Sequence, residues 1–112
     1  FHELALELRL DVLVEVHDEI ELERAISMGA NLIGVNQRDL YTFEVDHERA
    51  LRMGDLIGGS VTSVAESGVR DAADAATLAQ AGFDAVLVGE ILVTSGAPDL
   101  LVRAMTEVDL CL

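Results

Sequence analysis

The sequence predicts an α/β fold in which four parallel strands alternate with helices. Short apolar runs alternate with amphipathic stretches from end to end, and near-continuous apolar strands suit a parallel sheet that is covered on both faces. The segment MGANLIGVN (28–36) is similar to AGFDAVLVG (81–89) at an offset of 53 residues, as expected of repeated βα units. Eight such units need roughly 250 residues, whereas the chain has 112. The pattern therefore predicts half of a (β/α)8 TIM barrel, with residues 1–112 in a single domain.

The elements are expected in the order α-β-α-β-α-β-α-β-α, starting with the amphipathic stretch at the N-terminus. The four strands are predicted at residues 12–16, 32–35, 61–65 and 85–88. Asp18 with Glu21, and Asp71 with Asp74, have the spacing of capping boxes and predict the starts of two helices. Another helix is expected from about residue 46 to residue 56.

Proline and glycine mark further helix boundaries. Pro98 suits the first turn of a final helix. Gly29 and Gly82 occupy matching positions in the two similar segments, each between a helix and the next strand. A helix that ends there in a left-handed turn needs a residue without a Cβ, so both glycines are predicted to adopt positive φ.

Composition and charge narrow the classes of partner. A formal net charge of −14 argues against nucleic acid and anionic membranes as partners, because both would be repelled. No apolar run approaches the ~18 residues of a membrane span, and the first residues do not read as a targeting signal, so a cytoplasmic location is expected. The single cysteine, Cys111, excludes a disulfide within the chain. Because the chain starts at Phe1, it is expected to be a piece of a longer polypeptide.

Polar or small residues follow each predicted strand. In (β/α)8 barrels the chemistry lies where the strands end and the next loops begin, all at one rim. The candidates are therefore Glu15, His17 and Asp18 after the first strand, Asn36, Arg38 and Asp39 after the second, Glu66, Ser67 and Gly68 after the third, and Gly89 and Glu90 after the fourth.

Glu15 interrupts an apolar strand, and a carboxylate there is costly unless it is paired or solvated. Alternation along the strand puts Glu15 on the same face as Leu13 and His17, towards the barrel axis, while the valines face the helices. In that position burial and neighbouring groups are expected to raise the pKa of Glu15 towards the range of an acid/base catalyst. The alternative is a strand-end carboxylate that is neutralised by an arginine.

The other candidates have structural interpretations as well. Asn36 can make an Asx-type turn bond, the segment 66–68 can cap the following helix, and Gly89 can allow close packing. The segments SGV (67–69) and GE (89–90) offer backbone N–H groups near helix starts, and together they predict a phosphate site. The histidines lack the spacing of metal ligands and are expected at the surface: His2, His17 and His47.

Four motifs, in this order, resemble one known family: VEVHD, GVNQRDLYTFEVD, VAESGV and AGFDAVLVGE. They are similar to the C-terminal half of indole-3-glycerol phosphate synthase, and the resemblance extends over about residues 4–108. It implies strands five to eight of a (β/α)8 barrel. It also implies a carboxy-lyase of tryptophan biosynthesis that closes the indole ring of 1-(2-carboxyphenylamino)-1-deoxyribulose 5-phosphate, with loss of carbon dioxide and water. Such enzymes use no metal or organic cofactor.

The same resemblance implies roles for individual residues. Glu15 matches a glutamate of acid/base catalysis, and Asn36 and Arg38 match residues that position the substrate. The remaining matches are Glu66 and Ser67 with active-site residues and Gly68, Gly89 and Glu90 with the phosphate-binding loops. One departure is Ile91, because the last loop reads GEILVTSG where the family more often has GESLMR.

The absence of lysine is the second departure, since all seven basic residues are arginines. The resemblance implies that the catalytic lysines belong to the first half of the barrel. The expected partners are therefore that half-barrel, or a second copy of the chain, and a phosphorylated small molecule. The chain alone is expected to be inactive.

Two other classes of protein fit part of the pattern. Another phosphate-binding barrel, such as phosphoribosylanthranilate isomerase, has similar glycine loops, but it does not account for VEVHD and NQRDL together. A doubly wound binding module of the receiver type has a similar length and alternation of elements. Receivers use a lysine near the last strand, and this chain has none.

Overall fold

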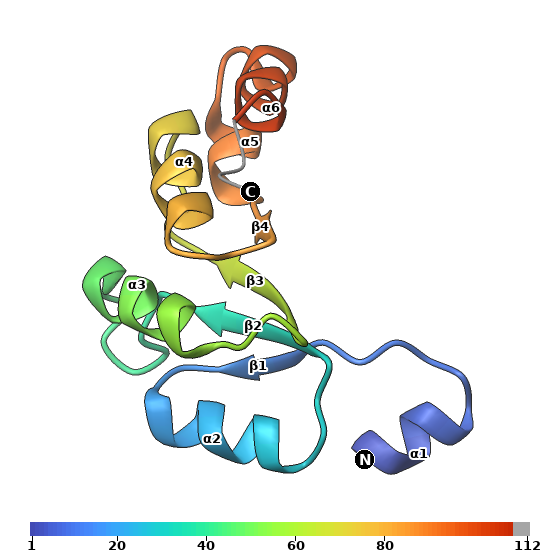
Figure 1. The fold of residues 1–112 in the computed structure, drawn as a ribbon. Coiled ribbons are helices and arrows are strands. Elements are labelled where there is room, and N and C mark those ends of the chain that lie inside the picture. The colour runs from blue at the N-terminus through green and yellow to red at the C-terminus, as the bar shows by residue number, and fades with distance from the viewer. Residues whose placement is uncertain (109–112) are drawn as a thin grey trace.

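The computed structural model describes residues 1–108, and Cys111 therefore lies outside the described residues. A single parallel sheet forms the centre of the fold, with its strands in the order β1-β2-β3-β4 (Figure 1). The strands are β1 (Val14–Val16), β2 (Leu32–Asn36), β3 (Thr62–Glu66) and β4 (Ala85–Leu87). Each strand pairs with the next one along the chain, as successive units of a (β/α)8 barrel do. The fold is therefore half of such a barrel, as predicted.

Strand order also separates this fold from a receiver module. A doubly wound sheet of that type has the order 2-1-3-4-5, because the chain reverses direction after the first unit. Here no reversal occurs among the described strands. The doubly wound alternative is wrong.

The helices are α1 (His2–Glu7), α2 (Glu19–Ser27), α3 (His47–Leu56), α4 (Ala72–Gln80), α5 (Glu90–Thr94) and α6 (Pro98–Thr106). Figure 1 shows α2, α3 and α4 along one side of the sheet, with α1 apart from them. The short helix α5 was not predicted; it follows β4 directly, before Pro98 starts α6. None of the helices within residues 1–108 is long and apolar enough to cross a membrane.

Side-chain caps start the helices where the sequence predicts them. The carboxylates of Asp18 and Asp71 accept hydrogen bonds from the backbone N–H groups of Glu21 (2.7 Å) and Asp74 (2.9 Å). The returning bond differs from a standard capping box, because the Glu21 carboxylate accepts from the N–H of His17, one residue before the cap. This bond holds the end of β1 against the start of α2.

Gly29 and Gly82 both have positive φ, 84° and 105°, as the internal repeat predicts. Each follows the last turn of a helix and precedes a strand, β2 or β4. The internal repeat therefore corresponds to the same left-handed turn after α2 and after α4, through which the chain returns from the helix to the sheet.

The core lies between one face of the sheet and the helices. Val16, Ile33, Val35 and Ala65 supply the sheet side of this core. The helix side is Leu22 and Ala25 of α2, Ala50 and Met53 of α3, and Ala75 and Leu78 of α4. On the other face, which would line the barrel interior, Leu13 and Leu87 are 43% and 56% exposed. The valines of β1 thus face the helices, as the alternation predicts.

Candidate active site

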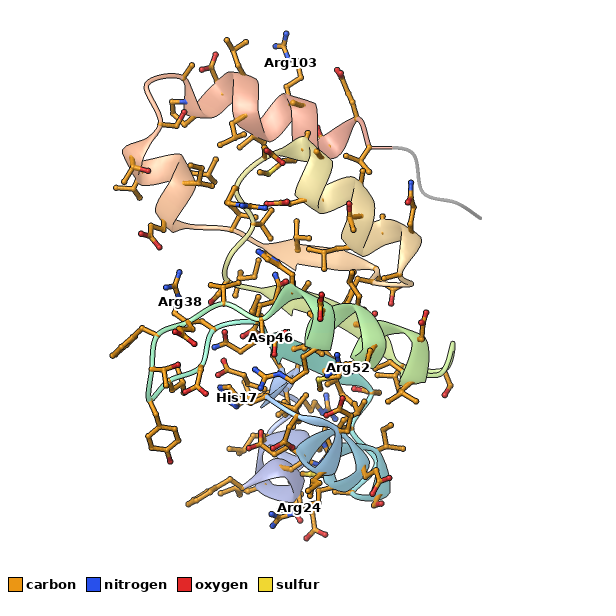
Figure 2. The ribbon with its side chains drawn as sticks, turned by 90° about the vertical axis from the view of Figure 1, so that its left-hand side faces the viewer. His17, Arg24, Arg38, Asp46, Arg52 and Arg103 are labelled. Carbon is orange, nitrogen blue, oxygen red and sulfur yellow. The ribbon has the colours of Figure 1, made fainter. Side chains whose placement is uncertain are left out.

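A cavity of about 800 Å³ lies at the carboxyl ends of the strands. The eight residues for which the family resemblance implies a role all line it: Glu15, Asn36, Arg38, Glu66, Ser67, Gly68, Gly89 and Glu90. The other three candidates at the strand ends do not line it: His17, Asp18 and Asp39. The register explains why they meet, because Asn36 is level with Glu66, and Glu66 is level with Leu87, in neighbouring parallel strands. Figure 2 shows His17 and Arg38 on the same side of the ribbon as the loop that follows β2.

Glu15 points away from the core, and 43% of its side chain is exposed. Its carboxylate Oε1 accepts a hydrogen bond from Asn36 Nδ2 at 3.2 Å and lies 3.5 Å from His17 Nε2. Among residues 1–108 no arginine forms an ion pair with it. The alternative of an arginine-neutralised carboxylate is therefore wrong.

Asn36 is 8% exposed and uses both ends of its side-chain amide. Its Oδ1 accepts a hydrogen bond from the backbone N–H of Arg38 at 3.0 Å, which is the Asx-type bond of the structural alternative. Its Nδ2 donates to Glu15. The turn bond fixes the orientation of the amide, so that the NH2 group is the end directed at Glu15.

Glu66 is only 4% exposed, and its carboxyl group lies close enough to that of Glu15 for each to affect the pKa of the other. Burial raises the pKa of Glu66 to about 7, and the hydrogen bond to Glu15 and the charge of Glu15 add to this rise. The pKa of Glu15 is lowered, chiefly by the same hydrogen bond and less by the amide of Asn36 and the charge of His17, against the effect of burial. The prediction of a raised pKa for Glu15 is therefore wrong, because the more deeply buried Glu66 has the raised pKa instead. Two neighbouring carboxyls thus differ in protonation near neutral pH, which suits acid/base chemistry.

The segment after β3 is a tight left-handed turn. Ser67 and Gly68 have φ values of 64° and 69°, and the carbonyl of Ser67 accepts a 2.6 Å hydrogen bond from Gln37 Nε2. Helix α4 is capped by Asp71, so the alternative that residues 66–68 cap this helix is wrong. The turn directs the backbone of Gly68 into the cavity wall.

Arg38 lines the cavity and contacts two of its loops. Its Nη1 donates to the carbonyl of Phe43 at 3.1 Å, and its Nη2 lies 3.4 Å from Glu90 Oε2, so that it joins the loops after β2 and β4. Gly89 caps α5, and a Cβ at that position would meet nothing within 4 Å. Close packing therefore does not explain Gly89. Ile91 also lines the cavity.

Two polar residues at the site, Gln37 and His47, were not among the candidates from the sequence, whereas His17 was. His17 is part-buried beside Glu15, and its Nδ1 lies 3.2 Å from Glu21 Oε2, so the predicted surface histidine is only partly exposed. His47 lines the cavity, and its Nδ1 lies 2.9 Å from Oε1 of the buried Gln37. The strand alternation did place His17 on the face of Glu15, whereas the burial of Gln37 has no local signal in the sequence.

A family model described as indole-3-glycerol phosphate synthase matches residues 1–105. The chain is 53% identical over 91 residues to the indole-3-glycerol phosphate synthase of Parafrankia sp., covering 81% of this chain and 34% of that protein. It is 46% identical over 108 residues to the corresponding protein of Nocardioides sp., covering 96% of this chain and 42% of that protein. The chain therefore spans about a third to two-fifths of the length of these relatives.

Solved structures give the same fold at lower sequence identity. The structure of mandelate oxidase with benzoyl-formic acid has a TM-score of 0.64 at 21% identity, over 88% of this chain and 33% of that one. The identity is low, so this likeness concerns the fold alone. The family match and the identities to the curated relatives lead to a specific conclusion: the chain belongs to the indole-3-glycerol phosphate synthase family.

Proposed function

We propose that the chain supplies the C-terminal half of the active site of an indole-3-glycerol phosphate synthase in the cytoplasm. The reaction converts 1-(2-carboxyphenylamino)-1-deoxyribulose 5-phosphate into indole-3-glycerol phosphate, carbon dioxide and water. The observation that carries the proposal is the meeting of all eight motif residues in one cavity at the carboxyl ends of the strands. A lyase of the tryptophan pathway is what the family match supports.

Acid/base chemistry is assigned to the carboxyl pair. Ring closure joins the aromatic ring to the substrate carbonyl, and it needs a proton donor at that carbonyl and proton acceptors for the later loss of water. Glu15, with its lowered pKa and partial exposure, suits the role of the base. Glu66 is the neutral neighbour. The family resemblance implies a lysine as the general acid at the carbonyl, and because this chain has no lysine, we assign that role to the other half of the barrel.

Substrate positioning is assigned to polar groups that line the cavity. Asn36 holds Glu15 in place and Arg38 offers a guanidinium to the anionic substrate. Ser67 lines the same cavity. Glu90 forms an ion pair with Arg38, so an anion that enters the cavity competes with this carboxylate.

The phosphate of the substrate is assigned to the loops after β3 and β4. Gly68 and Gly89 bring backbone close to the cavity, and phosphate sites of (β/α)8 barrels are commonly built from these two loops. Glu90 would contribute through its backbone, which needs no particular side chain. Ile91 does not interfere with such binding for the same reason.

Complementation by the missing part of the barrel tests this proposal. We define the chimera as the Parafrankia sp. relative with its matched region replaced by this chain. The chimera is expected to turn over the substrate. The 112-residue chain alone is expected to be inactive. It is expected to bind phosphate weakly, without a metal or cofactor. A folded chimera without synthase activity contradicts the proposed function. Turnover by the lysine-free chain contradicts the division of labour between the two halves.

A further inference from the structure

We propose that Gly34 is a positioning residue of this site, because its missing side chain opens the niche in which the carboxyl group of Glu66 lies against Glu15 with the shared proton on Glu66. Gly34 is buried in the middle of β2 and does not line the cavity. Neither a turn nor a positive φ explains a glycine at this position. The proposal rests on the proposed function for its catalytic meaning, but not for its structural content.

The geometry at Gly34 is specific to Glu66. A Cβ built on Gly34 would overlap Oε1 of Glu66, and it would approach Cδ of the same carboxyl group to 2.8 Å and Leu13 Cδ1 to 3.2 Å. Gly34 is level with Glu15 in β1 and with Val64 in β3, so it lies between the strands that carry the two glutamates. Any other residue at position 34 would occupy the space of the Glu66 carboxyl.

Burial in the niche favours the protonated form of Glu66 over that of Glu15. Oε1 of Glu66 is buried and meets no hydrogen-bond donor among residues 1–108. An ionised carboxylate has only acceptors, so burying it without a donor is costly, whereas a protonated carboxyl can donate to Glu15. Glu15 is more exposed and already accepts from Asn36, which favours its ionised form. The pair is therefore divided into a neutral donor and an ionised base.

Charged neighbours agree with this division. The groups whose charge acts on Glu66 are Glu15, which raises its pKa, and His17, which lowers it. Other titratable side chains of the cavity are Arg38, His47, Arg70 and Glu90. Arg38 and Arg70 are engaged by Glu90 and Asp74, so the described residues offer Glu66 no arginine partner. Burial in the niche remains the first cause of its protonation.

The carboxyl titrations give a direct test without turnover. In the chain labelled with 13C at glutamate Cδ, Glu15→Gln and Glu66→Gln assign the two signals. We expect an upper apparent pKa of about 7 for the pair, with Glu66 as the group that titrates. Gly34→Ala is expected to push Glu66 out of the niche and return this midpoint towards the ordinary range. Gly58→Ala is the matched control, because a Cβ at Gly58 meets nothing within 4 Å.

A second measurement covers the case in which Gly34→Ala does not fold. Glu66→Ala removes the side chain with which the methyl group introduced by Gly34→Ala would collide. The double variant Gly34→Ala/Glu66→Ala is therefore expected to fold. Its free energy of unfolding is expected to equal that of Glu66→Ala alone. The proposal is overturned if Glu66 titrates at its ordinary pKa in the parent chain. It is also overturned if Gly34→Ala leaves the midpoint unchanged, or if Gly34→Ala is equally damaging with and without the Glu66 side chain. Synthase activity of the chimera is measured separately, so failure of the proposed function is distinguishable from failure here.

Discussion

The side-chain amide of Asn36 donates a 3.2 Å hydrogen bond to the carboxylate of Glu15, across two neighbouring strands. The same amide is oriented by its bond from the backbone N–H of Arg38. One local turn bond thus determines which end of Asn36 meets Glu15, and with it the ionised state of that carboxylate. Substitution of Asn36 is therefore expected to change the pKa of Glu15.

Asn36→Asp is expected to raise the pKa of Glu15 and to lower kcat of the chimera by roughly 10- to 100-fold. The substitution keeps the acceptor for Arg38 but replaces the donor by a like charge, and a hydrogen bond to a charged group contributes about 1.5–3 kcal/mol. Steady-state kinetics and the 13C titration of Glu15 measure the two effects. Asn31→Asp, at an exposed asparagine, is the matched control. An unchanged kcat for Asn36→Asp contradicts the assigned role.

Glu15→Gln is expected to lower kcat of the chimera by roughly 10²- to 10⁴-fold, the range of a general acid/base group, and to change KM little. Glutamine preserves the shape and an acceptor for Asn36 but cannot take up a proton. Glu23→Gln, at an exposed glutamate of α2, controls for the loss of one charge. Retention of full kcat by Glu15→Gln removes Glu15 from the mechanism.

The raised pKa of Glu66 predicts that stability falls as pH rises. The folded state binds the proton of Glu66 up to about pH 7, whereas the unfolded chain releases it near the ordinary value of 4.5. The free energy of unfolding contributed by this proton is complete below the unfolded pKa and is lost between about pH 4.5 and 7, with a total of about 3 kcal/mol. The contribution of Glu15 to stability has the opposite pH dependence. Because its pKa is lowered in the folded state, this contribution is lost as the pH falls, at more acidic pH.

Denaturant unfolding of the chain at several pH values between 5 and 8 measures this effect. Glu66→Gln removes the titration, so its stability relative to the parent is expected to rise by about 2–3 kcal/mol from pH 5 to pH 8. The histidines are present in both proteins and cancel in the difference. A difference between the two proteins that does not change with pH contradicts the buried, protonated Glu66.

Local patterns predicted more of this fold than of its site. Strand alternation, the Asp18 and Asp71 caps and the repeated glycines depend on neighbours within a few residues, and the structure confirms them. The pairing of Glu15 with Glu66 depends on the register of three strands and on the niche at Gly34, which are non-local. The burial of Gln37 likewise depends on partners 10 and 30 residues away. Sequence motifs located these groups at one rim but gave no information on which carboxyl is protonated.

Exposed apolar surface on the inner face of the sheet predicts that the isolated chain associates. Leu13 and Leu87 are 43% and 56% exposed there, and within residues 1–108 the outer edges of β1 and β4 pair with no strand. Helix α1 has no buried residue, although Leu4 and Leu6 are apolar. Unpaired strand edges and apolar faces are surfaces through which chains associate.

Sedimentation velocity over a range of concentrations is expected to show oligomers whose fraction grows with concentration. Leu87→Gln is expected to weaken association by about tenfold or more, because burying a leucine contributes about 1.5–3 kcal/mol. Ile20→Gln is the matched control, since Ile20 is 71% exposed on α2, away from the inner face. The remaining part of the Parafrankia sp. relative, added in trans, is expected to suppress self-association by covering the same face. A concentration-independent monomer, or equal effects of Leu87→Gln and Ile20→Gln, contradicts the inner face as the surface of association.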